Sequence, residues 1–126
     1  MLVNTAAFGS KISGTKVCIA NRPPTREMPN LETLAVEMQN PAILNLLPLE
    51  TEVWLVKNEE ITWEEFAKRY RRRLNVVNVP KLLRRIAWHL GVDELTLCCY
   101  ESEKDEHCHR KILFEYIPDE MKGNRR

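Results

Sequence analysis

A cluster of cysteine, histidine and arginine residues near the C-terminus has the greatest potential for chemistry. Within Cys98–Arg110 lie three of the four cysteines, two of the three histidines and one arginine. A thiol at the start of a helix and beside histidines is favoured as a thiolate, and a histidine beside a carboxylate can move protons. This segment is therefore the first place to look for catalysis or ligand binding.

Glu101 and His109 have a spacing that suits an acid–base couple, in which the carboxylate orients the imidazole. Cys108 is a candidate nucleophile for the same reaction. However, Cys108 shares one helical stripe with Ile112 and Tyr116, which favours a structural side chain that faces the core. Glu101, His109 and Cys108 are thus the candidate catalytic residues, and nucleophilic catalysis is the less favoured role of the cysteine.

Two arginines indicate an anion site. Arg110 lies in the opening turns of the last predicted helix, where free amides favour negative charge, and Arg22 follows the first predicted strand. Together with Cys99 they are the candidate ligand-binding residues. In the alternative interpretation, Arg110 pairs with Glu101 or Glu106 and only fastens the loop to the helix.

A metal centre is disfavoured by the same segment. Consecutive strand residues point to opposite faces, so Cys98 and Cys99 cannot both reach one ion. His107, Cys108 and His109 are separated by about 100° each around a helix, so at most two of them converge. We therefore predict no metal site, and the sequence identifies no cofactor.

The elements that must position these residues alternate between strands and helices. Lys16–Ala20 and Leu95–Tyr100 are predicted strands, and the second is apolar enough to be buried on both faces, as in the middle of a parallel sheet. Val53–Val56 is a further predicted strand. Helices are predicted over 31–38, from Pro41, over 63–74 behind the cap Thr62, over 80–90, and from Asp105–His107 to Ile117.

Strands separated by helices predict an α/β fold, a small Rossmann-like three-layer sandwich with a mostly parallel sheet. At 126 residues the chain is expected to form a single domain, with an irregular lead-in at 1–14 and a basic tail at 118–126. Ligands of such sheets bind outside the carboxyl ends of the strands. Asn21, Arg22 and Glu101 follow the strands at that edge.

The net charge of +1 conceals an uneven distribution. Residues 63–89 contain eight basic and two acidic side chains, whereas 93–106 contain six acidic side chains and one lysine. The basic region could contact nucleic acid, with Trp88 as a stacking platform or part of a protein interface, or it could be an ordinary charged helix surface. The candidate nucleic-acid contacts are Lys68, Arg71, Arg72, Arg73, Arg84 and Arg85.

Composition excludes several classes of protein. Apolar residues make up 44% and charged residues 29%, which is typical of a globular chain rather than a disordered or collagenous one. No apolar run approaches the ~20 residues of a membrane span, and no signal peptide is recognisable. We expect a cytoplasmic protein that does not contact a membrane and whose cysteines are reduced.

Two motifs resemble a known family. Cys99-Tyr100-Glu101, followed by Cys108-His109-Arg110 at the start of the last helix, is similar to the C-terminal signature of the family catalogued as domain of unknown function 488. The strand-then-Arg-Pro segment Val17–Pro24 and the Trp63, Phe66 and Tyr70 helix support this resemblance. The resemblance implies a Rossmann-like α/β fold, but no established activity.

The sequence therefore predicts a small α/β protein that binds an anionic small molecule or a nucleotide-like group at the strand carboxyl ends. Hydrolysis and group transfer are the reactions that such a site would suit. The alternative is a non-catalytic module that associates with nucleic acid or protein through the basic region 68–85.

Overall fold

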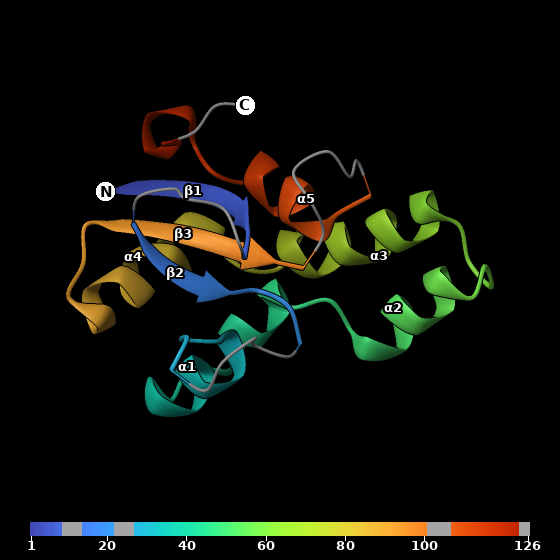
Figure 1. Ribbon diagram of the computed structural model, residues 1–126, viewed down its shortest axis with the longest axis horizontal. Helices are drawn as coiled ribbons and strands as arrows, with labels where there is room; N and C mark the ends of the chain where they lie inside the picture. Colours follow the sequence, from blue (N-terminus) through green and yellow to red (C-terminus); the bar gives the residue numbers. More distant parts are fainter. Residues whose placement is uncertain (9–13, 22–26, 101–106, 124–126) are drawn as a thin grey trace.

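A three-stranded parallel sheet organises the computed structural model, which describes residues 1–8, 14–21, 27–100 and 107–123. Its strands are β1 (Leu2–Ala7), β2 (Thr15–Cys18) and β3 (Glu94–Cys99), and β3 lies between the other two (Figure 1). Every residue of β3 after Glu94 is buried. The predicted buried strand in the middle of a parallel sheet is therefore confirmed.

Helices supply most of the remaining structure, and their ends follow local sequence signals. Asn30 and Thr62 cap two of them, because their side chains accept hydrogen bonds from backbone amides three residues later. Gly91 ends a third helix in the left-handed conformation, with φ of 69°. The elements are α1 (Leu31–Glu37), η1 (Pro41–Leu46), α2 (Glu50–Lys57), α3 (Trp63–Asn75), α4 (Val79–Leu90), α5 (His109–Glu115) and η2 (Asp119–Met121), where η marks a 3-10 helix.

Two predictions about the secondary structure are wrong. Val53–Val56 belongs to helix α2 and not to a strand. The helix has glutamates in its first turn and Lys57 in its last, which suits the helix dipole, and local apolar content alone could not reveal this. The lead-in at 1–14, which was expected to be irregular, contains β1. This strand forms because β3 supplies its backbone hydrogen-bond partners, and the local sequence does not reveal such distant partners.

The last helix starts later than predicted. It begins at His109 with Cys108 as its N-cap, rather than within Asp105–His107. Cys108 has an extended backbone, with φ of −131° and ψ of 130°. It is therefore not a helical residue, and the helical spacing that related it to Ile112 and Tyr116 does not apply to it. His109 and Arg110 consequently occupy the first turn of α5.

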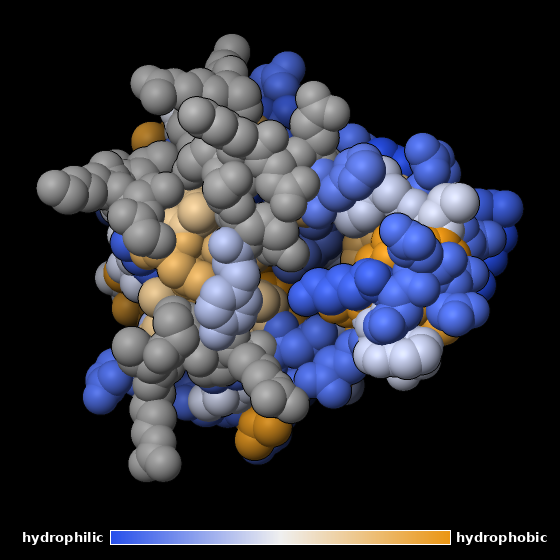
Figure 2. Space-filling view, turned by 45° about the vertical axis from the view of Figure 1, so that its right-hand side comes forward, coloured by the Kyte–Doolittle hydropathy of each residue, from blue (hydrophilic) through white to orange (hydrophobic). Residues whose placement is uncertain are grey.

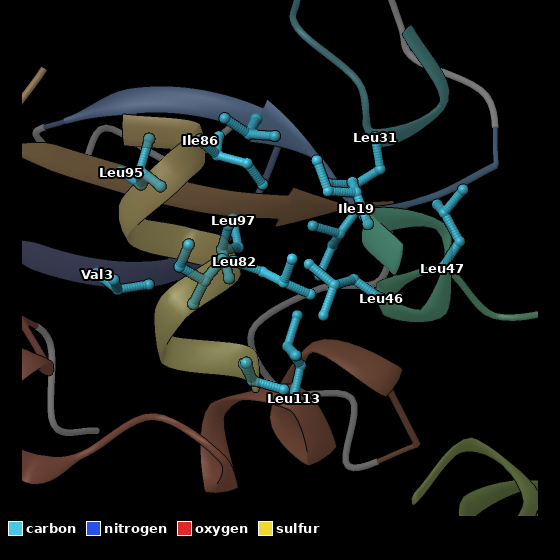
Figure 3. Close-up of a cluster of buried hydrophobic side chains, with 14 of the residues drawn as sticks. Val3, Ile19, Leu31, Leu46, Leu47, Leu82, Ile86, Leu95, Leu97 and Leu113 are labelled. Atoms are coloured by element: carbon cyan, nitrogen blue, oxygen red, sulfur yellow. The ribbon is translucent and has the colours of Figure 1, made fainter. Parts of the chain in front are cut away.

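The hydrophobic core fills one face of the sheet. Leu82 and Ile86 of α4 pack towards Leu95 and Leu97 of β3 (Figure 3). Buried residues of α1, η1, α3 and α5 join the same cluster, whereas α2 contributes none to it. The α/β class with a parallel sheet is confirmed, and the Rossmann-like three-layer arrangement stays a prediction. Within the described ranges, no helix is long and apolar enough to cross a membrane.

Candidate functional site

A groove lies between α2 and the carboxyl ends of β2 and β3. It consists of two adjoining cavities of about 440 and 390 Å³, which share the lining residues Val53, Lys57, Tyr100 and His109. We call it the α2 groove. This is the edge at which the sequence predicts a ligand site. The first cavity is also lined by Val56, Trp63, Phe66 and His107, and the second by Ala20, Asn21, Pro48, Glu50 and Trp54.

His109 is a buried polar side chain of this groove. It is only 6% exposed, yet it lines both cavities. Its Nε2 lies 2.8 Å from the carbonyl oxygen of Ile19, the residue that follows β2. Because a carbonyl can only accept, Nε2 must carry the hydrogen, and Nδ1 is the acceptor nitrogen of the neutral ring. The Tyr70 ring meets the imidazole edge to face, with centroids 5.7 Å apart.

Aromatic rings form much of the groove wall. The ring centroids of Trp63 and His107 are 5.0 Å apart at an interplanar angle of 16°, and Trp63 also stacks on Phe66. Trp54 and Tyr100 are each 58% exposed, so a ligand in the groove could reach their faces. Aromatic faces of this kind accept planar rings and cations.

One strong cation, Lys57, belongs to the groove. It is exposed and lines both cavities, and it forms no ion pair among the described residues. Glu50 is a carboxylate in the second cavity only. Among the described residues that line the first cavity, Lys57 is the only lysine or arginine, and none is a carboxylate.

Cys99 and Cys108 lie beneath the surface rather than in the groove wall. Their exposures are 0% and 1%, and their sulfur atoms are 2.8 Å apart. Neither residue is among those that line the two cavities. This position favours the structural role of Cys108 that the helical stripe predicted, because a substrate in the groove would not reach its sulfur.

Arg110 is also buried, at 1% exposure, and is absent from the lining of both cavities. A buried guanidinium is tolerated only where the surrounding protein satisfies it. Whether Arg110 binds a ligand or fastens the loop to α5 therefore stays a prediction, because Glu101 and Glu106, its predicted partners, lie outside the described residues.

Two predicted site residues lie outside the described residues. These are Arg22 and Glu101, so the proposed couple of Glu101 with His109 and the pairing of Glu101 or Glu106 with Arg110 stay predictions. Their sequence neighbours Asn21 and Tyr100 line the groove. Within the part of the chain that the structure describes, no three histidine, cysteine or acidic residues are placed to hold a metal ion.

Sequence reasoning missed the contribution of α2. Val53, Trp54 and Lys57 line the groove because α2 is a helix that packs beside α3, and the predicted strand at 53–56 concealed that arrangement. Figure 2 turns the end formed by α2 and α3 towards the viewer and shows hydrophobic atoms surrounded by hydrophilic ones. The signal that could have indicated a helix was the order of charges, with Glu50 and Glu52 at its start and Lys57 at its end.

The basic region is partly neutralised within the protein. Arg71 forms a two-oxygen ion pair with Glu115, and Arg73 bonds Glu52. Arg73 is only 19% exposed in its side chain, so this base is not part of a fully solvated helix surface. Trp88 is 88% exposed, so its ring is accessible to a partner.

The stability of the protein is expected to fall above pH 10 because of Tyr70. Burial raises the pKa of its phenol well above the ordinary value. The unfolded chain releases this proton near pH 10 while the folded protein retains it, so the associated stability is complete below pH 10 and is lost as pH rises. The loss is about 1.4 kcal/mol per pH unit for one such group.

Urea unfolding of wild type and Tyr70→Phe between pH 9 and pH 12 measures this effect, because other titrating groups are common to both proteins. The stability advantage of wild type should shrink as pH rises above 10. A constant difference over that range would contradict the assignment to Tyr70.

The fold and the groove together define a small α/β protein with a ligand-sized site at the carboxyl ends of a parallel sheet. A family model described as "Active DUF488-N3 subclade" matches residues 10–121, which is nearly the whole chain. The protein belongs to this subclade of the domain of unknown function 488 family, as the C-terminal motifs indicated. No curated protein and no solved structure gives a significant match.

Proposed function

We propose that this protein binds a small anionic molecule with a planar ring, such as a nucleotide, in the α2 groove. The observation that carries the proposal is the position of Lys57, an exposed cation between aromatic walls that lines both cavities together with His109. A phosphate beside Lys57 would gain a charge-assisted hydrogen bond, and a base could stack on Trp54 or Tyr100.

The dimensions of the groove agree with such a ligand. Cavities of about 440 and 390 Å³ lie within the usual range of ~300–1,000 Å³ for small-molecule sites. Because the two cavities share four lining residues, a ligand can place its ring in one part and its phosphate in the other.

His109 is the group that we assign to proton transfer, should the ligand be hydrolysed or transferred. The Ile19 carbonyl fixes the tautomer and the Tyr70 ring fixes the plane of the imidazole, so the ring is pre-oriented before a ligand arrives. Glu101 is the proposed acidic partner of the imidazolium form, in which Nδ1 carries a proton that a carboxylate can accept in a hydrogen bond. Cys108 is not needed as a nucleophile, and its burial supports leaving it out of the reaction.

Thermal unfolding in the presence of adenosine monophosphate, ribose 5-phosphate and inorganic phosphate tests the proposal. We expect the nucleotide to raise the melting temperature more than the other two compounds, because only it can use both the aromatic faces and the cation. Lys57→Ala should weaken nucleotide binding about tenfold or more, since a charge-assisted hydrogen bond contributes ~1.5–3 kcal/mol.

Lys81→Ala is the matched control, because Lys81 is an exposed lysine on α4 that does not line the groove. It should bind the nucleotide as wild type does. Equal stabilisation of wild type and Lys57→Ala, or no stabilisation by any of the three compounds, would rule out the proposed site. Oligonucleotide binding that survives Lys57→Ala but is lost on charge reversal of Lys68 and Arg72 would favour the nucleic-acid alternative instead.

A further inference from the structure

We propose that Cys99 and Cys108 form a reversible disulfide and so make a two-electron redox site beneath the α2 groove. Cys99 is the last residue of β3 and Cys108 is the N-cap of α5. Their sulfur atoms are 2.8 Å apart, whereas a disulfide bond is about 2.05 Å long. Formation of the bond therefore requires the two sulfurs to approach by less than ~1 Å.

The other two cysteines provide a comparison within the same sheet. Cys18 and Cys98 are opposite one another in the pairing of β2 with β3, and both are buried. Their thiols are directed to backbone carbonyls, since Cys18 Sγ lies 3.3 Å from the oxygen of Ala20 and Cys98 Sγ lies 3.5 Å from that of Thr96. Both cysteine pairs are buried, but the structure has a sulfur–sulfur contact between Cys99 and Cys108, whereas the thiols of Cys18 and Cys98 contact backbone carbonyls.

The oxidation balances with a hydroperoxide as the oxidant. The thiolate of one cysteine attacks a peroxide oxygen, the O–O bond breaks, and a sulfenic acid and an alcohol or water form. The sulfur of the other cysteine then attacks the sulfenic sulfur and displaces its hydroxide, which takes up the thiol proton and leaves as water. The two thiols lose two electrons and two protons in total, and a dithiol reductant reverses the step by exchange.

Access to the sulfurs limits the rate of this reaction. Cys99 and Cys108 are buried, so an oxidant reaches them only during a local opening of the structure. Helix α5 has only seven residues, and its N-cap side chain makes no capping hydrogen bond. Its first turn therefore opens more readily than the interior of the sheet, and this opening would expose Cys108 together with Cys99 at the end of β3. We therefore expect the Cys99–Cys108 pair to oxidise first.

The disulfide would tie the first turn of α5 to the end of β3. Because His109 follows Cys108 directly, the bond would hold this imidazole at the sheet edge even when α5 fluctuates. The oxidised protein should melt several degrees above the reduced protein, since the bond constrains the unfolded chain. This inference does not depend on what the α2 groove binds.

Treatment of the folded, fully reduced protein with a small excess of hydrogen peroxide tests the pair. We expect a mass loss of about 2 Da, a decrease in titratable thiols from four to two, and a disulfide-linked peptide that joins Cys99 to Cys108. Dithiothreitol should restore all four thiols. The same protein, oxidised and then re-reduced, should return to the lower melting temperature.

Two variants make the result specific. Cys108→Ser should form no intramolecular disulfide, whereas the double variant Cys18→Ala/Cys98→Ala should oxidise at the wild-type rate. If Cys108→Ser does not fold, the double variant and the peptide map of wild type still decide the question. A disulfide between Cys18 and Cys98, or stable sulfenic and sulfinic products without any Cys99–Cys108 bond, would overturn the proposal.

Discussion

Replacement of Glu52 with alanine is expected to destabilise the protein by about 3 kcal/mol and to loosen α2 from α3. Glu52 is a buried carboxylate on α2, and Oε1 lies 2.5 Å from Nη1 of Arg73 on α3. Its other oxygen lies 3.8 Å from Nη1 of Arg69. Removal of the carboxylate would leave the guanidinium of Arg73 without its acidic partner. Nε and Nη2 of Arg73 already have no hydrogen-bond acceptor among the described residues, so the buried charge would lose its main stabilising contact.

The consequence for the α2 groove is as important as the loss of stability. Helix α2 places Val53, Trp54 and Lys57 in the groove, yet it adds no residue to the main hydrophobic cluster. The ion pair to α3 is therefore a principal link between the groove wall and the rest of the protein. We expect Glu52→Ala to weaken binding of the nucleotide probe although Glu52 lines neither cavity.

Urea unfolding, together with amide hydrogen exchange over residues 50–57, measures both effects. Thr51→Ala is the matched control, because Thr51 is an exposed neighbour on α2 and its loss should change stability by less than ~0.5 kcal/mol. In an Arg73→Met background, Glu52→Ala should cost much less, since no cation remains to be stranded. An equal cost in both backgrounds would show that the ion pair is not the link.

Replacement of Tyr70 with alanine is expected to be at least as damaging, at about 3–5 kcal/mol. Tyr70 is fully buried, and its hydroxyl donates a 2.5 Å hydrogen bond to the carbonyl of Leu46. Its ring is nearly perpendicular to that of His109, at 5.7 Å between centroids, and lies 5.6 Å from the guanidinium carbon of Arg73. The substitution would therefore remove core volume and the support of the imidazole at the same time.

Tyr70→Phe separates these contributions. It keeps the ring but leaves the Leu46 carbonyl without its donor, so it should cost about 1–3 kcal/mol while nucleotide affinity stays close to that of wild type. Tyr116→Phe is the control for loss of a more exposed hydroxyl, which donates to Asn75, and should cost less than ~1 kcal/mol.

Urea unfolding and nucleotide titration on the same samples provide both readouts. If Tyr70→Ala is too unstable to study, Tyr70→Leu replaces it. Unchanged nucleotide affinity in a folded variant that lacks the ring would show that His109 does not need this support.

The sequence by itself determined the features that depend on local or strongly periodic signals. The caps at Asn30 and Thr62, the glycine stop at Gly91 and the mostly apolar run of β3 all predict their elements correctly. The motifs Cys99-Tyr100-Glu101 and Cys108-His109-Arg110 also indicated the family that the match over residues 10–121 shows. These features are encoded by neighbouring residues, so no distant contact was needed to recognise them.

Only the tertiary structure decided what surrounds the site. Strand β1 forms because each of its residues pairs with a residue of the parallel strand β3. Helix α2 is joined to α3 by the ion pair of Glu52 with Arg73, which are 21 residues apart in the chain. The cation that lines the groove is Lys57 on α2, the helix that the sequence predicted in part as a strand. Arg110 and Cys108, which the sequence predicted as site residues, are instead buried. Contacts between distant residues determined these positions, because local propensity and helical spacing do not specify which surfaces meet.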